Sequence, residues 1–290
     1  MRSFEYVAAG DIRHAVQLLA EHGAEARILA GGTDLLADLK SSAHGPRLVI
    51  DISRAQALKG ITLTPAGLCI GAMTTHTEIM RSALIAEHCP VLAAAAHTIG
   101  AVQTRNLGTL GGNLVTAVPS MDSGPALVAL DAQVGLAGSA GERRLPLTDF
   151  FRGPRKTALK ADELLIDIVI PATSLGKPAA FLKSGLRKGQ ALALVNAAAS
   201  LWLDGKGRII EPRVALGAVA PVVMRATDAE QFLAGRPPAP GVFVQAGALA
   251  AAACKPISDF RASAGYRRDL VAVLVQRALA QAYAMAEGRT

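Results

Sequence analysis

Two glycine pairs are the residues of this sequence best suited to binding a ligand through the main chain. One lies in LAGGTD, residues 29–34, and the other in GTLGGN, residues 108–113. Glycine lets main-chain N–H groups approach a ligand closely because it carries no Cβ atom. A run of such N–H groups before a helix forms an anion site. Two such loops that face each other are suited to holding two linked phosphates, as in a dinucleotide cofactor.

A single glycine pair is usually only a turn, and each pair taken alone favours that structural interpretation. The sequence has no G-x-G-x-x-G after a strand, so the Rossmann dinucleotide fingerprint is absent. It also contains no H-E-x-x-H, G-x-S-x-G or Walker A sequence. These residues alone predict an anion-binding protein, with a dinucleotide as one candidate ligand.

The composition limits the class of protein. A length of 290 residues predicts two or three compact units. The net charge of +7 suits an anionic ligand or an acidic partner surface. Scattered basic residues and an aromatic content of only 4% argue against nucleic-acid binding. No apolar run is long enough to span a membrane and the N-terminus has no apolar signal region, so we expect a cytoplasmic protein with no transmembrane segment.

The cysteines do not have the spacing of a metal site. Cys69, Cys89 and Cys254 form no C-x-x-C pair, and none has a histidine at ligand spacing. We therefore expect reduced thiols in or near the core, and neither zinc nor an iron–sulfur cluster on this chain.

The first 55 residues predict a small β-α-β-like unit around the first glycine pair. Asp11 can cap a helix that Gly23 ends. A strand at 26–30, a helix at 35–40 and a second strand at 47–52 follow.

Residues 56–175 predict a second unit around the other glycine pair. The expected elements are a hairpin at 60–72, a helix capped by Thr75 or Thr77, a helix opened by Pro90, a break at 100–106, a helical or turn-rich stretch at 122–132, and strands at 133–138 and 162–171.

Residues 176–290 predict a C-terminal unit that follows a linker-like stretch at 174–179. Strands at 180–189, 193–204 and 208–220 are expected, with a hairpin turn at 204–207. Two or three helices then close the chain, the last at 266–287. Strands followed by helices indicate an α+β fold rather than a doubly wound sheet.

The sequence ILAGGTDLL (28–36), followed by TIGAVQTRNLGTLGGNL (98–114), resembles the FAD-binding (medium) subunit of the molybdenum hydroxylases. This is the family of xanthine dehydrogenase and carbon monoxide dehydrogenase. The similarity continues in order through 117–127, 150–171 and 180–204, and so covers essentially the whole chain. The resemblance implies a two-part FAD-binding region of the vanillyl-alcohol-oxidase/PCMH type, followed by a three-stranded antiparallel sheet with helices.

The resemblance also implies which residues lie along the cofactor. FAD would lie between the first two units, with its pyrophosphate on main-chain N–H groups of residues 30–34 and of the turn at 109–113. Asp122 matches an acidic residue near the cofactor, although it could instead cap the helix that follows; Lys183 matches a lysine after the linker, although it could instead face solvent. The expected cofactor-binding residues are Arg27, Ile28, Leu29, Ala30, Gly31, Gly32, Thr33, Asp34, Leu35, Ile99, Gly108, Thr109, Gly111, Gly112, Asn113, Asp122, Leu165 and Lys183.

The function implied by the resemblance is electron transfer, with no catalytic residue and no metal ligand on this chain. Electrons would come from 2Fe-2S clusters of a small partner subunit, and a molybdopterin-type cofactor would be bound by a large partner subunit. FAD on this chain would pass the electrons to an external acceptor, in a heterotrimer or a dimer of heterotrimers. The alternatives are a non-redox nucleotide-binding scaffold and a self-contained flavin oxidase of the vanillyl-alcohol type.

Overall fold

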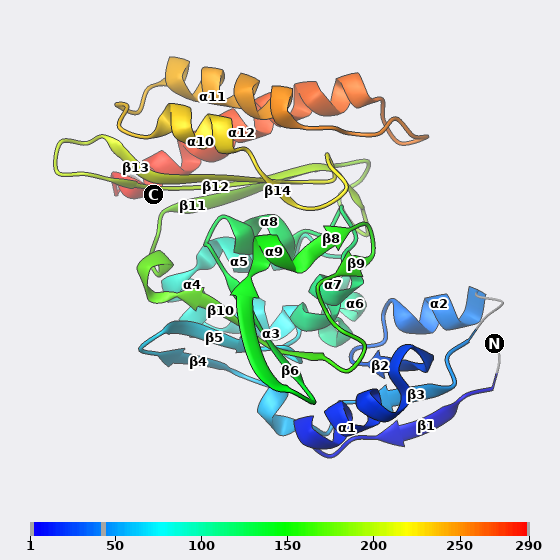
Figure 1. The fold of residues 1–290 in the computed structure, drawn as a ribbon. Helices are drawn as coiled ribbons and strands as arrows, with labels where there is room; N and C mark the ends of the chain where they lie inside the picture. Colours follow the sequence, from blue (N-terminus) through cyan, green and yellow to red (C-terminus); the bar gives the residue numbers. More distant parts are fainter. Residues whose placement is uncertain (1–2, 42–44, 289–290) are drawn as a thin grey trace.

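Three larger sheets follow one another along the chain in the computed structural model, which describes residues 3–41 and 45–288 (Figure 1). The N-terminal sheet is parallel, with strand order β1-β3-β2. Its elements are β1 (Glu5–Ala8), α1 (Ile12–His22), the 3-10 turn η1 (Gly23–Glu25), β2 (Ala26–Leu29), α2 (Leu35–Ser41) and β3 (Leu48–Asp51). The Asp11 carboxylate accepts a hydrogen bond from the His14 N–H at 2.8 Å, which confirms the predicted cap. The pattern did not predict β1, since the strand is short and only partly buried.

The middle sheet is antiparallel, with strand order β4-β5-β10-β6-β7. Its strands are β4 (Ile61–Thr64), β5 (Gly67–Gly71), β6 (Gln133–Gly138), β7 (Gly141–Pro146) and β10 (Leu164–Pro171), beside a small hairpin of β8 (Phe151–Gly153) and β9 (Lys156–Thr157). The helices of this region are η2 (Gln56–Leu58), α3 (His76–Arg81), α4 (Ala83–His88), α5 (Pro90–His97), α6 (Val102–Leu107), α7 (Leu110–Thr116), α8 (Ser123–Val128), α9 (Leu147–Phe150) and η3 (Ala172–Ser174).

The helix opened by Pro90 ends at His97, before the break predicted at 100–106, but that stretch contains a separate helix, α6, that was not expected. The expectation for the second glycine pair was wrong, because the pair lies in the first turn of helix α7 rather than in a tight turn. The Thr109 hydroxyl caps α7 by accepting a hydrogen bond from the Gly112 N–H at 3.1 Å. This cap and the burial of Leu110 and Leu114 offset the low helix propensity of two adjacent glycines.

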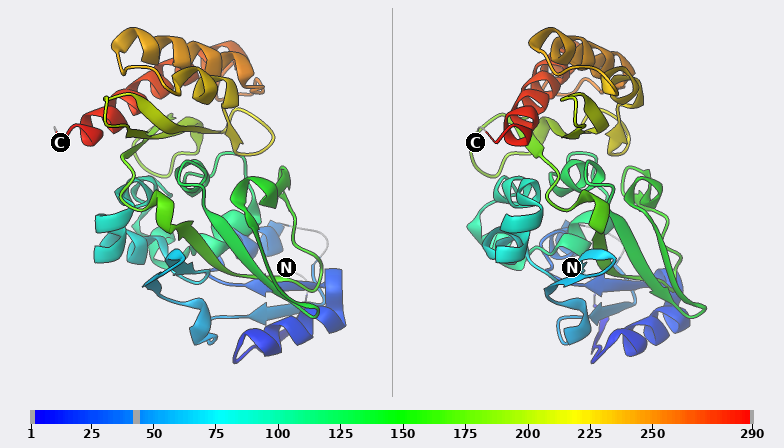
Figure 2. Two further views of the ribbon diagram at one scale, coloured as in Figure 1. Left: turned by 60° about the vertical axis from the view of Figure 1, so that its left-hand side comes forward. Right: turned by 90° about the vertical axis from the view of Figure 1, so that its left-hand side faces the viewer.

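The C-terminal sheet has the order β11-β12-β13-β14 and so contains four strands rather than the three expected. The fourth, β14 (Met224–Arg225), is only two residues long, too short to produce an alternating pattern. The other elements are β11 (Ala179–Gly185), β12 (Ala193–Leu203), β13 (Ile209–Gly217), α10 (Thr227–Leu233), α11 (Pro240–Ala253) and α12 (Ala264–Ala286). Helices α10 and α12 cover the outer face of the sheet, and α11 packs on these two helices. The inner face of the sheet lies against α5 and α8 (Figures 1 and 2).

The core is divided in the same way as the sheets. Separate groups of buried apolar side chains fill the N-terminal region, the middle region and the space between the C-terminal sheet and its helices. Cys89 and Cys254 are buried and Cys69 is half-buried, in agreement with the expected position of the thiols. Within the described residues, no helix combines the length and the apolar character needed to cross a membrane.

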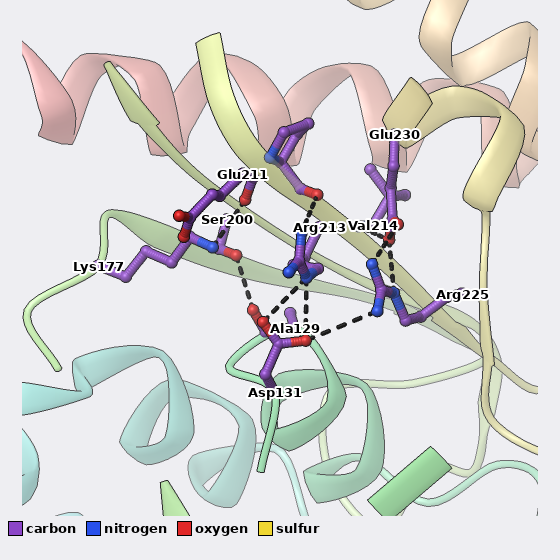
Figure 3. Close-up of polar contacts among 10 residues, drawn as sticks. Ala129, Asp131, Lys177, Ser200, Glu211, Arg213, Val214, Arg225 and Glu230 are labelled. Atoms are coloured by element: carbon purple, nitrogen blue, oxygen red, sulfur yellow. Dashed lines mark hydrogen bonds and ion pairs between the residues drawn. The ribbon is translucent and has the colours of Figure 1, made fainter. Parts of the chain in front are cut away.

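A cluster of charged side chains joins the inner face of the C-terminal sheet to the turn after α8 through hydrogen bonds and ion pairs (Figure 3). The Arg213 Nε atom donates to both carboxylate oxygens of Asp131 at 2.9 Å. Arg225 lies 3.6 Å from the same carboxylate and also donates to Glu230 at 3.0 Å. Since Asp131 belongs to the middle region and the two arginines lie on β13 and β14, these contacts fix the position of the C-terminal sheet relative to the turn after α8.

Lys177 lies at the edge of this cluster and is only 4% exposed. Its ammonium group donates to the Glu211 carbonyl oxygen at 2.7 Å (Figure 3). Burial and, to a smaller extent, the nearby Arg213 guanidinium lower the pKa of Lys177 to about 8, although Asp131 and Glu211 oppose the shift. The folded chain therefore holds a lysine that is easier to deprotonate than a lysine in the unfolded chain.

This shift predicts how stability depends on pH. Between about pH 8 and 10.5 the unfolded chain keeps the Lys177 proton and the folded chain releases it, so the free energy of unfolding rises with pH in this window. The parent should gain stability relative to Lys177→Met by at most about 1.4 kcal/mol per pH unit. Urea unfolding of both proteins across the window measures the difference. A difference that does not change with pH would show that Lys177 keeps its ordinary pKa.

Candidate functional site

The first glycine pair forms a loop that packs directly on the main chain of the second. Strand β2 ends at Leu29, and residues 30–34 lead into α2. A Cβ atom at Gly31 would lie 1.8 Å from the Leu107 carbonyl oxygen, so only glycine fits at this position. Gly32 has a φ of +71°, a conformation that glycine adopts without strain. The two glycine segments therefore meet with no side chain between them.

The two segments differ in whether their main-chain N–H groups are already paired. The main-chain N–H groups of residues 31–34 have no hydrogen-bond partner among the described residues. In the second segment, the N–H groups of Leu110 and Gly111 donate to Thr74 and Ala72 carbonyl oxygens, both at 2.9 Å, and that of Gly112 donates to Thr109. We expected both segments to offer N–H groups to a ligand, but the structure leaves those of the first segment free and pairs most of those of the second.

A cavity of about 330 Å³ lies between the two segments. Its lining contains most of the residues expected to contact the cofactor, namely Ile28, Ala30, Gly31, Gly32, Thr33, Asp34, Leu35, Ile99, Gly108, Thr109, Gly111, Gly112, Asn113 and Leu165. A second hollow of about 310 Å³ shares Ile99 and Asn113 with it and reaches Asp122. A third hollow, of about 800 Å³, adjoins the second at Gln190 and reaches Lys183. The hollows form a continuous row, which suits an elongated ligand.

Asp122 and Lys183 form an ion pair beside the second and third hollows. The Lys183 ammonium lies 2.5 Å from the Asp122 carboxylate and also donates to the Thr98 carbonyl oxygen at 3.0 Å. Asn196 donates to the other Asp122 oxygen at 2.8 Å. Burial raises the pKa of the Asp122 carboxyl, and the Lys183 ammonium opposes that shift. Asp122 therefore does not cap α8 through its side chain, and Lys183 does not face solvent.

Two of the expected residues lie outside the row of hollows. The Arg27 guanidinium is exposed and donates to the Ala24 and Ala26 carbonyl oxygens, both at 2.7 Å. The Leu29 side chain packs near Gly32, where its Cδ1 atom would lie 3.2 Å from an added Cβ atom. The assignment of these two residues, like that of the whole set, stays a prediction.

Two polar residues beside these hollows were not predicted from the sequence. His76 lines the first cavity, and Asn196 holds Asp122 from strand β12. A signal for Asn196 was present, because it is a lone amide in the apolar strand ALVNAAASLWL. His76 follows the helix cap Thr75 in TTHTEI and gave no signal beyond that position.

The ion pair gives a prediction about stability. Lys183→Met leaves the Asp122 carboxylate buried without its cation, so the free energy of unfolding should fall by about 3 kcal/mol. The double variant Lys183→Met/Asp122→Asn removes both charges and should lose less than the two single variants together. Urea unfolding of the four proteins without added FAD measures both effects. Additive losses would mean that the two groups do not interact.

Comparisons with known proteins agree with the resemblance. A family model described as the FAD binding domain in molybdopterin dehydrogenase matches residues 2–173. A second model, described as the CO dehydrogenase flavoprotein C-terminal domain, matches residues 180–282. Together the two models span nearly the whole chain.

Individual relatives are similar along their full length. The chain is 32% identical to the 6-hydroxypseudooxynicotine dehydrogenase complex subunit alpha of Paenarthrobacter nicotinovorans, over 97% of this chain and 94% of the relative. It is 32% identical to the xanthine dehydrogenase FAD-binding subunit of Escherichia coli O157:H7, over 98% and 97%. The structure matches a chain of carbon monoxide dehydrogenase from Hydrogenophaga pseudoflava with a TM-score of 0.93 and 34% identity, over 98% of both chains. The chain therefore belongs to the FAD-binding medium-subunit family of the molybdenum hydroxylases.

Proposed function

We propose that this chain is the FAD-carrying electron-transfer subunit of a molybdenum-containing hydroxylase or dehydrogenase complex. It takes electrons from 2Fe-2S clusters of a partner chain and passes them to an external acceptor. The observation that carries the proposal is the row of unpaired main-chain N–H groups at residues 31–34, which line the cavity between the glycine segments. Such groups are suited to binding the diphosphate of FAD.

The residues present fit this cofactor. Residues 31–34 bind the diphosphate through the main chain, and the Thr109 hydroxyl and the Asn113 side chain lie across the same cavity. Ile99 and Leu165 supply apolar contacts, and the Asp122–Lys183 pair lies beyond Ile99. When bound, FAD supplies the redox chemistry, while the chain binds it, orients it and sets its potential.

The proposed domains correspond to the three sheets. Residues 1–55 and 56–175 form the two FAD-binding subdomains, and residues 176–290 form the C-terminal domain. Lys183 belongs to the C-terminal domain, so this domain also contributes to the site. The proposed set of cofactor contacts includes Arg27 and Leu29, which rest on the resemblance alone.

The proposed partners are a large molybdopterin-binding subunit and a small 2Fe-2S subunit, in a cytoplasmic heterotrimer or a dimer of heterotrimers. The relative from Paenarthrobacter is named as one subunit of a dehydrogenase complex. Large apolar side chains are exposed beside the hollows, at Val102 (61%), Leu107 (60%), Leu186 (61%) and Leu192 (58%). Partner chains would cover such side chains in an assembled complex.

Purification of the tagged full-length chain from its native cells tests the proposal. We expect molybdenum, iron and flavin to elute together with two partner chains, and the flavin absorption to bleach when the complex is reduced. A colourless chain that does not take up added FAD would favour the nucleotide-binding scaffold. Turnover of a reductant by the isolated chain would favour the self-contained oxidase.

The contact between the glycine segments predicts the effect of one methyl group. In Gly31→Ala the added Cβ atom collides with the Leu107 carbonyl oxygen, so the two segments must move apart. The dissociation constant for FAD should rise by about fivefold to 150-fold, since the strain of overpacking is typically about 1–3 kcal/mol. Quenching of flavin fluorescence during titration of the FAD-free chain measures the constant.

Gly10→Ala is the matched control. No atom lies within 4 Å of a Cβ atom added at Gly10. This variant should bind FAD as tightly as the parent, and equal binding by Gly31→Ala as well would show that the close approach of the segments is not needed for FAD.

A further inference from the structure

The His76 side chain is a polar group in the wall of the cavity. It is not among the residues expected to contact the cofactor. His76 is the first residue of α3 and is only 2% exposed. Thr75 and Glu78 form a capping box at this end of the helix, and the His76 N–H donates to the Gly108 carbonyl oxygen at 3.1 Å. These hydrogen bonds hold the main chain at the start of α3 against the second glycine segment.

The imidazole lies where the two glycine segments meet. A Cβ atom added at Gly108 would lie 3.4 Å from His76 Cδ2 and 3.6 Å from the Thr33 hydroxyl oxygen. His76 Nδ1 is buried and has no hydrogen-bond partner among the described residues. Buried imidazole nitrogens are normally paired, so this nitrogen indicates a missing partner. The ring forms part of the cavity wall, so a molecule bound in the cavity lies against it.

The two sides of the cavity differ in what they can offer an anion. The first segment offers the unpaired N–H groups of residues 31–34, whereas those of Leu110, Gly111 and Gly112 are already paired. None of the described residues that line this cavity is lysine or arginine. On the side of the second segment, the side chains of Thr109, Asn113 and His76 line the cavity and can offer a hydrogen bond to a phosphate.

The protonation state of His76 suits this role. Burial and the nearby Arg105 guanidinium lower the pKa of the imidazole to about 4. The ring is then neutral at physiological pH and has one N–H donor and one nitrogen acceptor. It can donate one hydrogen bond to an oxygen atom without placing a second buried charge in the wall.

We propose that His76 is a further FAD-contacting residue, whose imidazole N–H donates a hydrogen bond to a diphosphate oxygen from the side opposite residues 31–34. This inference rests on the proposed function, because it requires FAD in the cavity. In this arrangement His76 binds the cofactor and carries out no chemical step. The contact explains why a polar ring is buried against the second glycine segment with a nitrogen unpaired.

The test compares the full-length parent with His76→Leu and His76→Asn. Leucine fills much of the space but offers no donor, so the dissociation constant for FAD should rise about tenfold to a hundredfold, the range expected for a hydrogen bond to a charged group. Asparagine keeps an N–H group close to the position of Nδ1, so it should recover most of the lost affinity. Phosphorus NMR of bound FAD should show a changed diphosphate signal in His76→Leu and a smaller change in His76→Asn.

His14→Leu is the matched control, because it makes the same histidine-to-leucine substitution at an exposed position of α1. It should leave both the dissociation constant and the phosphorus signals unchanged. Thermal unfolding without FAD checks that each variant is folded.

The outcomes separate this inference from the proposed function. If the parent and His76→Leu bind FAD equally tightly with the same phosphorus signals, the contact is wrong and the proposed function stands. A folded parent that takes up no FAD overturns the proposed function, and the contact with it. Weaker binding by His76→Leu, with recovery in His76→Asn, supports the contact.

Discussion

The contact between the main chain at Gly31 and the Leu107 carbonyl oxygen is the constraint on which the site depends. It allows no Cβ atom, so it brings the loop after β2 against the end of α6 with only main chain between them. The cavity, the unpaired N–H groups and the position of His76 all lie at this junction. Because the contact joins the loop after β2 to the end of α6, the geometry of the site also reports how the N-terminal and middle regions pack.

The features that could be predicted from the sequence are those with a local cause. Asp11 caps α1, Thr75 caps α3, and the turn at 204–207 joins β12 to β13, since each needs only a few neighbouring residues. The features that were missed depend on contacts distant in the chain. Helix α6, the two-residue strand β14 and the burial of His76 have no repeating pattern of their own. The pairing of the second segment's N–H groups also required tertiary structure, because their partners, Thr74 and Ala72, lie more than thirty positions away.

The C-terminal domain takes part in the site through a buried charge. Lys183 on β11 and Asn196 on β12 both bind the Asp122 carboxylate, which belongs to the middle region. A buried carboxylate without a cation is costly, so this pair ties the sheet to the cavity. The Arg213–Asp131 contact fixes the same sheet from its other end. A change in how the C-terminal domain packs would therefore change the electrostatic environment beyond Ile99, one of the residues that the resemblance implies along the cofactor.

The net charge of the chain and the charge of the cavity are separate properties. The sequence carries a net charge of +7, which suggested an anionic ligand. Yet Asp34 and Glu163 are charged residues of the cavity wall, and no described lysine or arginine lines it. Attraction for a diphosphate must therefore come from main-chain dipoles and neutral donors at fixed positions rather than from cations. Such donors act only over a short distance, so they select a ligand by its shape, and a small error in their position removes most of their effect. This is why the absence of a Cβ atom at Gly31 matters more for the site than the positive charge of the surface.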